Sequence, residues 1–396
     1  MAFGITKTRL SPIAVDFGAD QLKLLQFERG SEDKLVAAAC HVLPEAARQH
    51  PADRRAALAD ALPNLLRNHP FRGKRAFISI PAFQTLVLHL ELPGSDNADL
   101  ESQANLHLQT ELGLNPGSMV VRHHHVGSVL RNGKTHQAVV TIAADRGTVM
   151  AYLELAQACR LEVAGMHAEP HCVVRAFSTV YTRRADDASR VAAYIDIGSA
   201  TTKIAIAQGD TLRFARSIHA GGEQLTRQFC KEHRIDFMEG RLARVAQAAG
   251  SAVSISAATS HLIPTGSPLA ALAAAAPPAS PTVTADDRRT DYLDQPEPDH
   301  ECYHTLADEL GLALRYHDEA FPDHPVDALV FCGGEANHTG LCRSLAQRFG
   351  LRAQLGDPFV RLQRGPDVKP CPGIDPFAPQ PGWAVPFGLC VSEANL

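Results

Sequence analysis

The chain has 396 residues, of which 45% are hydrophobic and 20% charged, and its formal net charge is −5 at pH 7. These proportions are ordinary for a globular protein, and the length favours about two to three domains. The negative charge argues against a nucleic-acid-binding protein, because proteins that hold a phosphate backbone usually carry a basic face.

The cysteines and the apolar stretches favour a cytoplasmic protein. Nine cysteines are scattered along the chain without a Cys-x-x-Cys pair, which is typical of reduced thiols and not of a disulfide framework or a zinc site. The amino terminus lacks the apolar stretch of a signal peptide. The longest apolar run, residues 269–276, is too short to cross a bilayer. We expect no direct membrane insertion, so any membrane role depends on a partner.

Strand and helix signals alternate along the chain, which predicts an α/β protein. The expected strands are residues 12–17, 22–27, 75–80, 85–90, 138–143, 191–197, 202–207 and 328–332. The expected helices are residues 54–67, 100–112, 148–158, 224–233, 238–249, 302–317 and 339–349. Residues 250–301 are rich in Ala and Pro, with Tyr292 as their single Phe, Tyr or Trp residue, and we expect a disordered insertion there.

An internal repeat is the most informative pattern in the sequence. Residues 13–24 align with residues 193–204: each segment has an apolar strand, an Asp-x-Gly turn, a Lys seven positions after the Asp, and a second apolar strand. A single hairpin of this kind is common between strands. Two hairpins in the same register, 180 positions apart (Asp16 and Asp196), indicate a duplicated domain.

If the two hairpins face each other, their turns suit a phosphorylated ligand. Gly18 and Gly198 allow an anion to approach the backbone N–H groups closely, and Asp16 and Asp196 suit a hydrated Mg²⁺. The alternative is a pair of ordinary hairpins in which each Asp stabilises its own turn.

The two turns differ in the side chains that they offer to a phosphate. The second turn carries hydroxyl groups on Thr201 and Thr202, which are suitable hydrogen-bond donors. The first turn has no hydroxyl, and the carboxylate of Asp20 repels an anion. The first turn is therefore the poorer phosphate site.

A third element lies near the carboxyl end, where an apolar strand runs into Gly333, Gly334 and Glu335 before a helix begins at about Thr339. Two glycines after a buried strand let a nucleoside lie against the backbone. The alternative is a glycine turn that closes a strand–loop–helix unit.

Two Asp-x-Gly hairpins followed by a Gly-Gly turn resemble the superfamily of actin, sugar kinases and heat-shock chaperone ATPases. Within it, the chain resembles the PilM family of type IV pilus assembly, which is also similar to the cell-division protein FtsA. The segments that carry this closer resemblance are residues 75–81, 88–93, 110–113, 164–170, 221–226, 310–316 and 383–389. The resemblance implies a duplicated actin-like (ribonuclease H-like) two-lobed α/β fold with a small inserted α+β subdomain.

The resemblance also implies a division of the chain. The first lobe starts at 12–72, is interrupted by the small subdomain at 73–145, and ends with a connector at 146–185. The second lobe starts at 190–249, is interrupted by the insertion at 250–301, and is completed by the adenosine turn and closing helix at 302–396.

ATP and Mg²⁺ are implied to lie between the lobes. The positions that match the family's nucleotide site are Asp16, Gly18 and Lys23 in the first turn, Asp196, Gly198, Thr201 and Thr202 in the second, Arg244 in the following helix, and Gly333, Gly334 and Glu335 in the adenosine turn. Asp16 and Asp196 match the metal positions. The sequence departs from the family in the helix at 238–249, which has Glu239, Arg241 and Arg244 where the family places a Glu and a Lys.

Glu169 is the candidate catalytic residue. It falls on the connector strand, where actin-like ATPases place the group that orients the attacking water. The alternative is a solvated or helix-capping Glu before Pro170. We expect at most a slow ATPase. Three consecutive histidines, His123 to His125, do not suit one metal ion, because adjacent side chains of a strand point to opposite faces.

The resemblance implies a cytoplasmic scaffold that is peripheral to the inner membrane through its partners. Its expected partner is a PilN-like single-pass inner-membrane protein, whose N-terminal cytoplasmic tail binds in a groove that the nucleotide adjusts; self-association is left open. One alternative is an adaptor that has lost nucleotide binding. The other is a sugar or acid kinase, which would need an Asp as base near Glu169.

Overall fold

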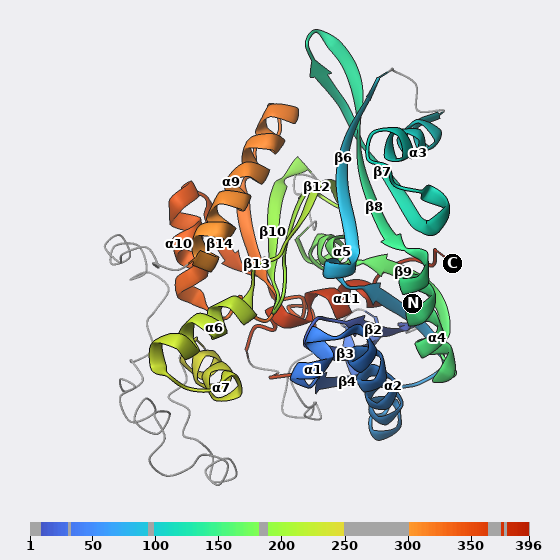
Figure 1. Ribbon diagram of the computed structural model, residues 1–396, viewed down its shortest axis with the longest axis vertical. Helices are drawn as coiled ribbons and strands as arrows, with labels where there is room; N and C mark the ends of the chain where they lie inside the picture. The colour runs from blue at the N-terminus through green and yellow to red at the C-terminus, as the bar shows by residue number, and fades with distance from the viewer. Residues whose placement is uncertain are drawn as a thin grey trace, which may run out of the picture.

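The computed structural model describes residues 9–30, 33–93, 99–181, 189–248, 301–362, 374–375 and 378–395. Apart from Glu301, the predicted disordered insertion at 250–301 lies outside the described residues. Two β-sheets form the centres of two lobes, and a small third sheet lies above them (Figure 1). None of the described helices combines the length and the apolar character that a bilayer span requires.

The two large sheets have the same strand order. The first sheet runs β4–β3–β2–β5–β9, with β1 beside β2 on the same edge of β3; the second runs β12–β11–β10–β13–β14. The first consists of β1 (Arg9–Leu10), β2 (Ile13–Phe17), β3 (Gln21–Arg29), β4 (Lys34–Val42), β5 (Arg75–Ile80) and β9 (Glu162–Ala168). The second consists of β10 (Val191–Ile197), β11 (Thr202–Gln208), β12 (Thr211–Ile218), β13 (Ala328–Cys332) and β14 (Arg352–Leu355).

The register of the two hairpins is also the same. Asp16 pairs with Lys23 across β2 and β3, and Asp196 pairs with Lys203 across β10 and β11. In each sheet the first strand of the hairpin then pairs in parallel with the next strand, β5 or β13. The structure therefore confirms the duplication that the sequence repeat predicts.

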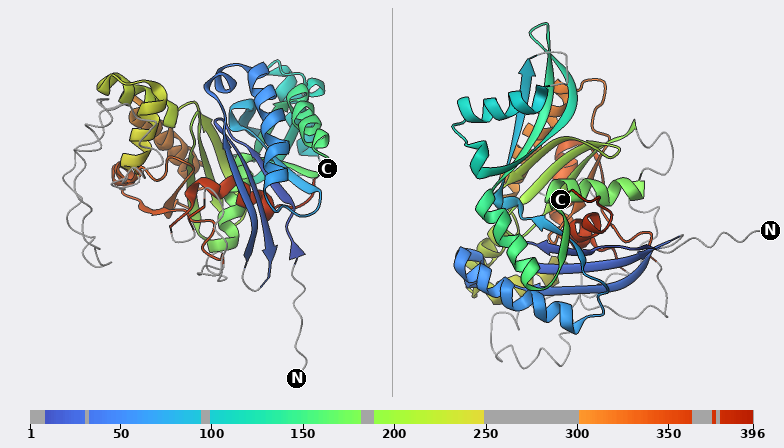
Figure 2. Two further views of the ribbon diagram at one scale, coloured as in Figure 1. Left: turned by 90° about the horizontal axis from the view of Figure 1, so that it is seen from below. Right: turned by 90° about the vertical axis from the view of Figure 1, so that its right-hand side faces the viewer.

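Helices cover the outer face of each sheet (Figure 2), and the inner faces of both sheets contribute to one hydrophobic core. Outside the first sheet lie α2 (Pro51–Asn68) and α4 (Arg146–Ala158), and outside the second lie α9 (Glu301–Ala320) and α10 (Thr339–Phe349). Between the sheets, α5 (Glu169–Tyr181) packs on β11 and α11 (Ala384–Cys390) on β2. These two helices join one hydrophobic core with residues from both lobes.

The small subdomain interrupts the first lobe after β5. It contains β6 (Thr85–Pro93), α3 (Leu100–Thr110), β7 (Met119–Arg131) and β8 (Lys134–Asp145), with strand order β6–β8–β7. The ring of His89 on β6 stacks on Phe214 of β12, with 4.4 Å between ring centroids. The subdomain therefore contacts the second lobe as well as the first.

The remaining elements are short or lie beside the interface between the lobes. They are α1 (Glu45–Gln49), η1 (Ala82–Gln84), η3 (Pro116–Ser118), α6 (Gly222–His233), α7 (Phe237–Ala248) and η6 (Pro381–Trp383).

Six strands of the structure lie outside the ranges expected from the sequence: β1, β4, β7, β9, β12 and β14. Among them, β1 has two residues, and β4 and β14 have few of the β-branched and aromatic side chains that indicate a strand. Glu169 also differs from expectation, because it begins helix α5 instead of lying on a strand. The limits of the domains stay a prediction.

Candidate functional site

Asp16 lies buried at the end of β2 and is held by a neighbouring hydroxyl group. Its Oδ1 accepts a hydrogen bond from Ser79 Oγ on β5 at 2.8 Å, and the same Oγ accepts one from the Phe17 N–H at 3.0 Å. Burial raises the pKa of Asp16, and the nearby charge of Lys23 opposes that rise. One carboxylate oxygen is thus already engaged within the first lobe.

The first turn is held by Arg54, which is not among the site residues predicted from the sequence. Its buried guanidinium donates hydrogen bonds to the carbonyl oxygens of Phe17, Gly18 and Ala19 at 2.9, 2.7 and 2.8 Å. Arg54 lies one helical turn before Leu58 on the buried face of α2. In the sequence, Arg54 falls on the apolar face of the predicted helix. This position indicates a functional or structural role, because a buried cation requires polar partners.

Lys23 connects the first hairpin to the second lobe. Its Nζ donates to the Gly382 carbonyl oxygen at 2.6 Å and lies 5.6 Å from the centroid of the Trp383 ring. The Gly333 N–H donates to the carbonyl oxygen of Pro381 at 2.9 Å. The short helix η6 therefore lies between the first hairpin and the Gly-Gly turn.

Both turns are close-packed at their glycines. A Cβ at Gly18 would lie 2.9 Å from the Gln21 carbonyl oxygen, and one at Gly198 would lie 2.8 Å from that of Thr201. Both distances are shorter than normal Cβ contacts, so each turn requires glycine. This similarity extends the duplication from the strands to the turns.

The second turn presents unused backbone donors. In the part of the chain that the structure describes, the N–H groups of Ser199 and Ala200 have no hydrogen-bond acceptor. The hydroxyl group of Thr202 is already engaged, since it donates to the Ala220 carbonyl oxygen at 2.8 Å, and Thr201 is buried beside it. Successive free N–H groups in a turn form a concavity that suits an anion.

Behind the second turn, the buried ammonium of Lys203 lies between two carboxylates. Its Nζ is 3.0 Å from Asp196 Oδ2 and 3.1 Å from Glu169 Oε2. Burial raises the pKa of Glu169 to about 7. Burial alone lowers the pKa of Lys203, but Asp196 and Glu169 outweigh it, so that pKa is raised. Lys203 belongs to the sequence repeat but is not among the predicted site residues.

The Gly-Gly turn packs directly on the second hairpin. Gly333 has a φ of +89°, and a Cβ there would lie 2.4 Å from Asp196 Oδ1. The Glu335 N–H donates to the Ile197 carbonyl oxygen at 3.0 Å. A Cβ at Gly334 would meet nothing within 4 Å. The backbone of Gly334 is therefore open to a ligand.

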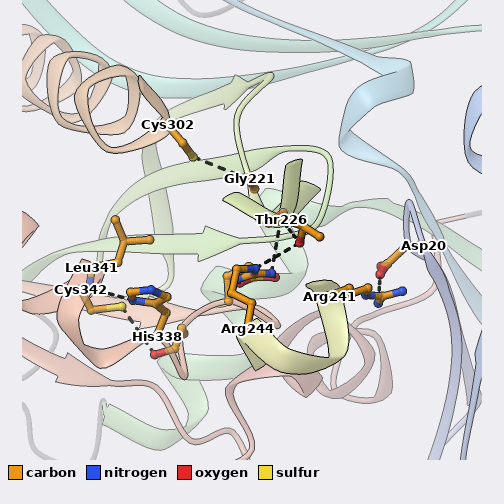
Figure 3. A network of polar contacts seen from close by, with 12 residues as sticks. Asp20, Gly221, Thr226, Arg241, Arg244, Cys302, His338, Leu341 and Cys342 are labelled. Carbon is orange, nitrogen blue, oxygen red and sulfur yellow. Dashed lines mark hydrogen bonds and ion pairs between the residues drawn. The ribbon is translucent and has the colours of Figure 1, made fainter. Parts of the chain in front are cut away.

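Arg244 and Glu335 form a bidentate ion pair. Arg244 Nη1 lies 2.5 Å from Glu335 Oε2 and Nη2 lies 2.8 Å from Oε1. Arg244 Nε also donates to Thr226 Oγ1 at 3.1 Å (Figure 3). The structure thus brings α7 and the Gly-Gly turn together. The predicted nucleotide-contacting side chains, Arg244 and Glu335, form hydrogen bonds with each other.

A second ion pair joins the two lobes directly. Arg241 on α7 donates through Nη2 to Asp20 Oδ2 in the first turn (Figure 3). Both side chains are largely buried, with exposed fractions of 18% and 14%. The sequence predicts repulsion of phosphate by Asp20 but not this pairing.

The residues fit the phosphates of a nucleotide better than they fit a magnesium ion. Free N–H groups at the second turn and the open backbone at Gly334 suit a nucleotide. In contrast, Asp196 and Glu169 already bind Lys203, and Asp16 accepts a hydrogen bond from Ser79. Among the described residues, no group of three or more metal-ligating side chains is arranged around a common point.

The three consecutive histidines have separate surroundings. His123 Nδ1 lies 2.8 Å from Thr141 Oγ1, and His125 Nε2 lies 2.7 Å from Gln137 Oε1. The His124 ring packs against that of His171, with 4.0 Å between centroids. Their side chains point to different neighbours, as the strand alternation predicts.

Comparisons with known proteins agree with this geometry. The family model for the type IV pilus assembly protein PilM matches residues 14–256. A solved PilM–PilN type IV pilus biogenesis complex is similar over 96% of this chain and 98% of that chain, with 17% identity and a TM-score of 0.68. The fold is thus actin-like, with two lobes, as predicted.

Two further solved structures have lower similarity. The ethanolamine utilization protein EutJ from Carboxydothermus hydrogenoformans has 12% identity and a TM-score of 0.48, with 97% of this chain and 89% of that chain covered. MreB5 of Spiroplasma citri, bound to ADP, has 11% identity and a TM-score of 0.45, with 96% and 95% covered. No curated protein sequence matches the chain.

Proposed function

The chain belongs to the family of the type IV pilus assembly protein PilM, and we propose from that premise that it is a nucleotide-binding scaffold of pilus or related secretion assembly. It acts in the cytoplasm at the inner membrane. It binds ATP between its lobes and the N-terminal cytoplasmic tail of a PilN-like membrane protein in a groove that the nucleotide adjusts.

The observation that carries this proposal is the pair of hairpins in identical register beside the Gly-Gly turn. The N–H groups of Ser199 and Ala200 would hold phosphate oxygens, and the open backbone at Gly334 would lie against the nucleoside. In the first turn, the N–H groups of Ala19 and Asp20 likewise have no acceptor among the described residues. Both lobes therefore offer donors to one ligand.

Contacts with both lobes give the nucleotide a way to set their separation. The lobes share the core around α5 and α11 and are bridged by Lys23 and by the Asp20–Arg241 pair. A ligand that binds one lobe arrangement better than another shifts the population toward it. The partner groove changes shape with that arrangement.

Hydrolysis is expected to be slow. A group that orients an attacking water needs a free acceptor oxygen, and Glu169 Oε2 already binds the ammonium of Lys203. Nucleotide binding, and not turnover, is therefore the main activity that we assign to the site.

The test is calorimetry with ATP on the wild type and on Gly334→Leu. A side chain at Gly334 meets open space in the protein, so this variant should fold but exclude the nucleoside. Gly340→Leu, on the exposed start of α10, is the matched control. Micromolar binding that only Gly334→Leu abolishes would support the proposal.

The partner is tested by the affinity of a synthetic peptide of the PilN-like tail, measured with and without ATP. A change of several-fold on adding ATP is expected. Equal peptide affinity in both conditions, with ATP bound, would show that the nucleotide does not adjust the groove.

The second candidate function is an adaptor that binds its partner without any nucleotide. The Arg244–Glu335 pair favours it, because both predicted nucleotide-contacting side chains satisfy each other inside the protein. Absence of ATP binding by the wild type together with normal peptide binding would establish the adaptor.

A further inference from the structure

The second hairpin contains a buried cation of its own. Lys203 is 6% exposed and its Nζ lies within 3.1 Å of one oxygen each of Asp196 and Glu169. The three groups come from three elements: β11, the end of β10 and the start of α5. The ammonium therefore ties the second sheet to helix α5 of the shared core.

The buried ammonium lies close to the backbone of the second turn. Its Nζ lies 3.4 Å from the position that a Cβ of Gly198 would take. Gly198 has no side chain to cover the ammonium at this point, and the N–H groups of Ser199 and Ala200 in the same turn have no acceptor among the described residues. A phosphate that is bound to those N–H groups would lie beside a positive charge.

The corresponding Lys in the first hairpin has a different role. Lys23 occupies the same register position, but its Nζ turns away to the Gly382 carbonyl oxygen. Lys203 is thus the cation that pairs with Asp196 and Glu169.

A divalent ion at these carboxylates would be opposed by the ammonium. Two unit positive charges about 4 Å apart repel each other by about 4 kcal/mol at an effective dielectric constant of about 20. For a divalent ion beside the ammonium, this repulsion is about twice as large. One oxygen of each carboxylate is also engaged, since the protonated amine donates to Glu169 Oε2 and to Asp196 Oδ2.

We propose that the ammonium of Lys203 takes the place of a divalent metal ion at this site. It compensates part of the negative charge of Asp196 and Glu169, places a positive charge near the nucleotide phosphates, and makes nucleotide binding independent of Mg²⁺. This inference rests on the proposed nucleotide site and specifies the cation that serves it.

The test compares ATP affinity with excess Mg²⁺ and with EDTA. For the wild type and for the exposed-surface control Lys231→Gln, we expect the two affinities to agree within about threefold. For Lys203→Gln, we expect EDTA to weaken binding at least about tenfold, because the freed carboxylates repel phosphate until a metal ion neutralises them. A tenfold loss in the wild type would overturn the inference.

Removal of Lys203 leaves two buried carboxylates unpaired, so Lys203→Gln is accompanied by the double variant Lys203→Gln/Glu169→Gln, which retains a single carboxylate. The double variant should also require Mg²⁺ for full ATP affinity. Equal affinity of the double variant in Mg²⁺ and in EDTA would count against a metal-replacing role of Lys203.

A second arm needs no nucleotide and separates the two proposals. Binding of Mn²⁺ is followed by electron paramagnetic resonance on the wild type, on Asp196→Asn and on Lys203→Gln. We expect no binding to the wild type and binding to Lys203→Gln. Binding to the wild type that Asp196→Asn removes would overturn the inference, whereas failure of ATP to bind in any condition would overturn only the nucleotide site.

Discussion

Asp20 in the first turn and Arg241 on α7 form an ion pair that joins the two lobes. The carbonyl groups of the turn that carries Asp20 also accept hydrogen bonds from Arg54. The pair therefore fixes a rigid part of the first lobe to the second at the place where phosphates are proposed to bind. A triphosphate would compete with Asp20 for the guanidinium of Arg241.

The first prediction concerns this competition. Asp20→Asn should raise the affinity for ATP about fivefold, because removing a carboxylate beside the phosphates relieves about 1 kcal/mol of screened repulsion and frees Arg241. Arg241→Gln should lower the affinity instead. Calorimetry at low and high salt measures the ATP affinity of both variants, with Asp60→Asn, at an exposed position of α2, as the control. A weaker affinity in Asp20→Asn would contradict the competition.

The sequence predicts the repeated parts of this site better than the parts that join them. Asp16, Gly18, Asp196 and Gly198 follow local rules for a hairpin turn, so their register is readable from one segment compared with another. The partner of Arg241 is not readable, because it lies 221 positions away in the other lobe.

Helix α5 illustrates a second limit. Glu169 precedes Pro170, which is compatible with an extended connector as well as with the first turn of a helix. The choice depends on packing: α5 is buried against α11 and β11 in the core between the lobes. The local sequence around Glu169 contains no information on this packing, because α11 and β11 are far away along the chain.

The second prediction concerns the contact of the Gly-Gly turn with Asp196. Gly333→Ala should destabilise the protein by about 2 kcal/mol or more, since the Cβ would overlap Asp196 Oδ1 and the Ile197 carbonyl oxygen at a positive φ. Urea unfolding measures the loss. Gly350→Ala, which has a φ of +63° but open space around it, reports the cost of the backbone conformation alone and should lose about 1 kcal/mol. Equal losses in both variants would mean that the contact with Asp196 contributes nothing.

The third prediction concerns the pH dependence of Glu169. Its folded-state pKa of about 7 lies above the ordinary value of 4.5 because the carboxyl is buried. The unfolded chain therefore ionises first, and the contribution of Glu169 to stability is present below about pH 4.5 and is lost as the pH rises to about 7. Compared with Glu169→Gln, the wild type should lose about 2 kcal/mol between pH 5 and pH 8.

Urea unfolding across that pH range gives the difference in the free energy of unfolding between the wild type and Glu169→Gln. Groups that titrate alike in both proteins cancel from this difference. Parallel stability curves for wild type and Glu169→Gln would show that the carboxyl is ionised throughout and that Lys203 controls it.

The fourth prediction concerns His167 at the end of β9, whose contribution to stability is lost as the pH falls and not, as for Glu169, as the pH rises. Burial lowers the pKa of His167 from 6.5 to about 4, and the ring packs edge-on against Phe77, with 5.5 Å between centroids. Its contribution is present above about pH 6.5 and is lost as the pH falls toward 4, because the unfolded chain takes up the proton first. At pH 5 the wild type should have lost about 2 kcal/mol of stability relative to pH 7.

His167→Gln should remove this part of the acid sensitivity, whereas His41→Gln, on the exposed end of β4, should retain it. An unchanged acid slope in His167→Gln would mean that His167 is protonated in the folded protein, with a counter-charge that compensates its burial.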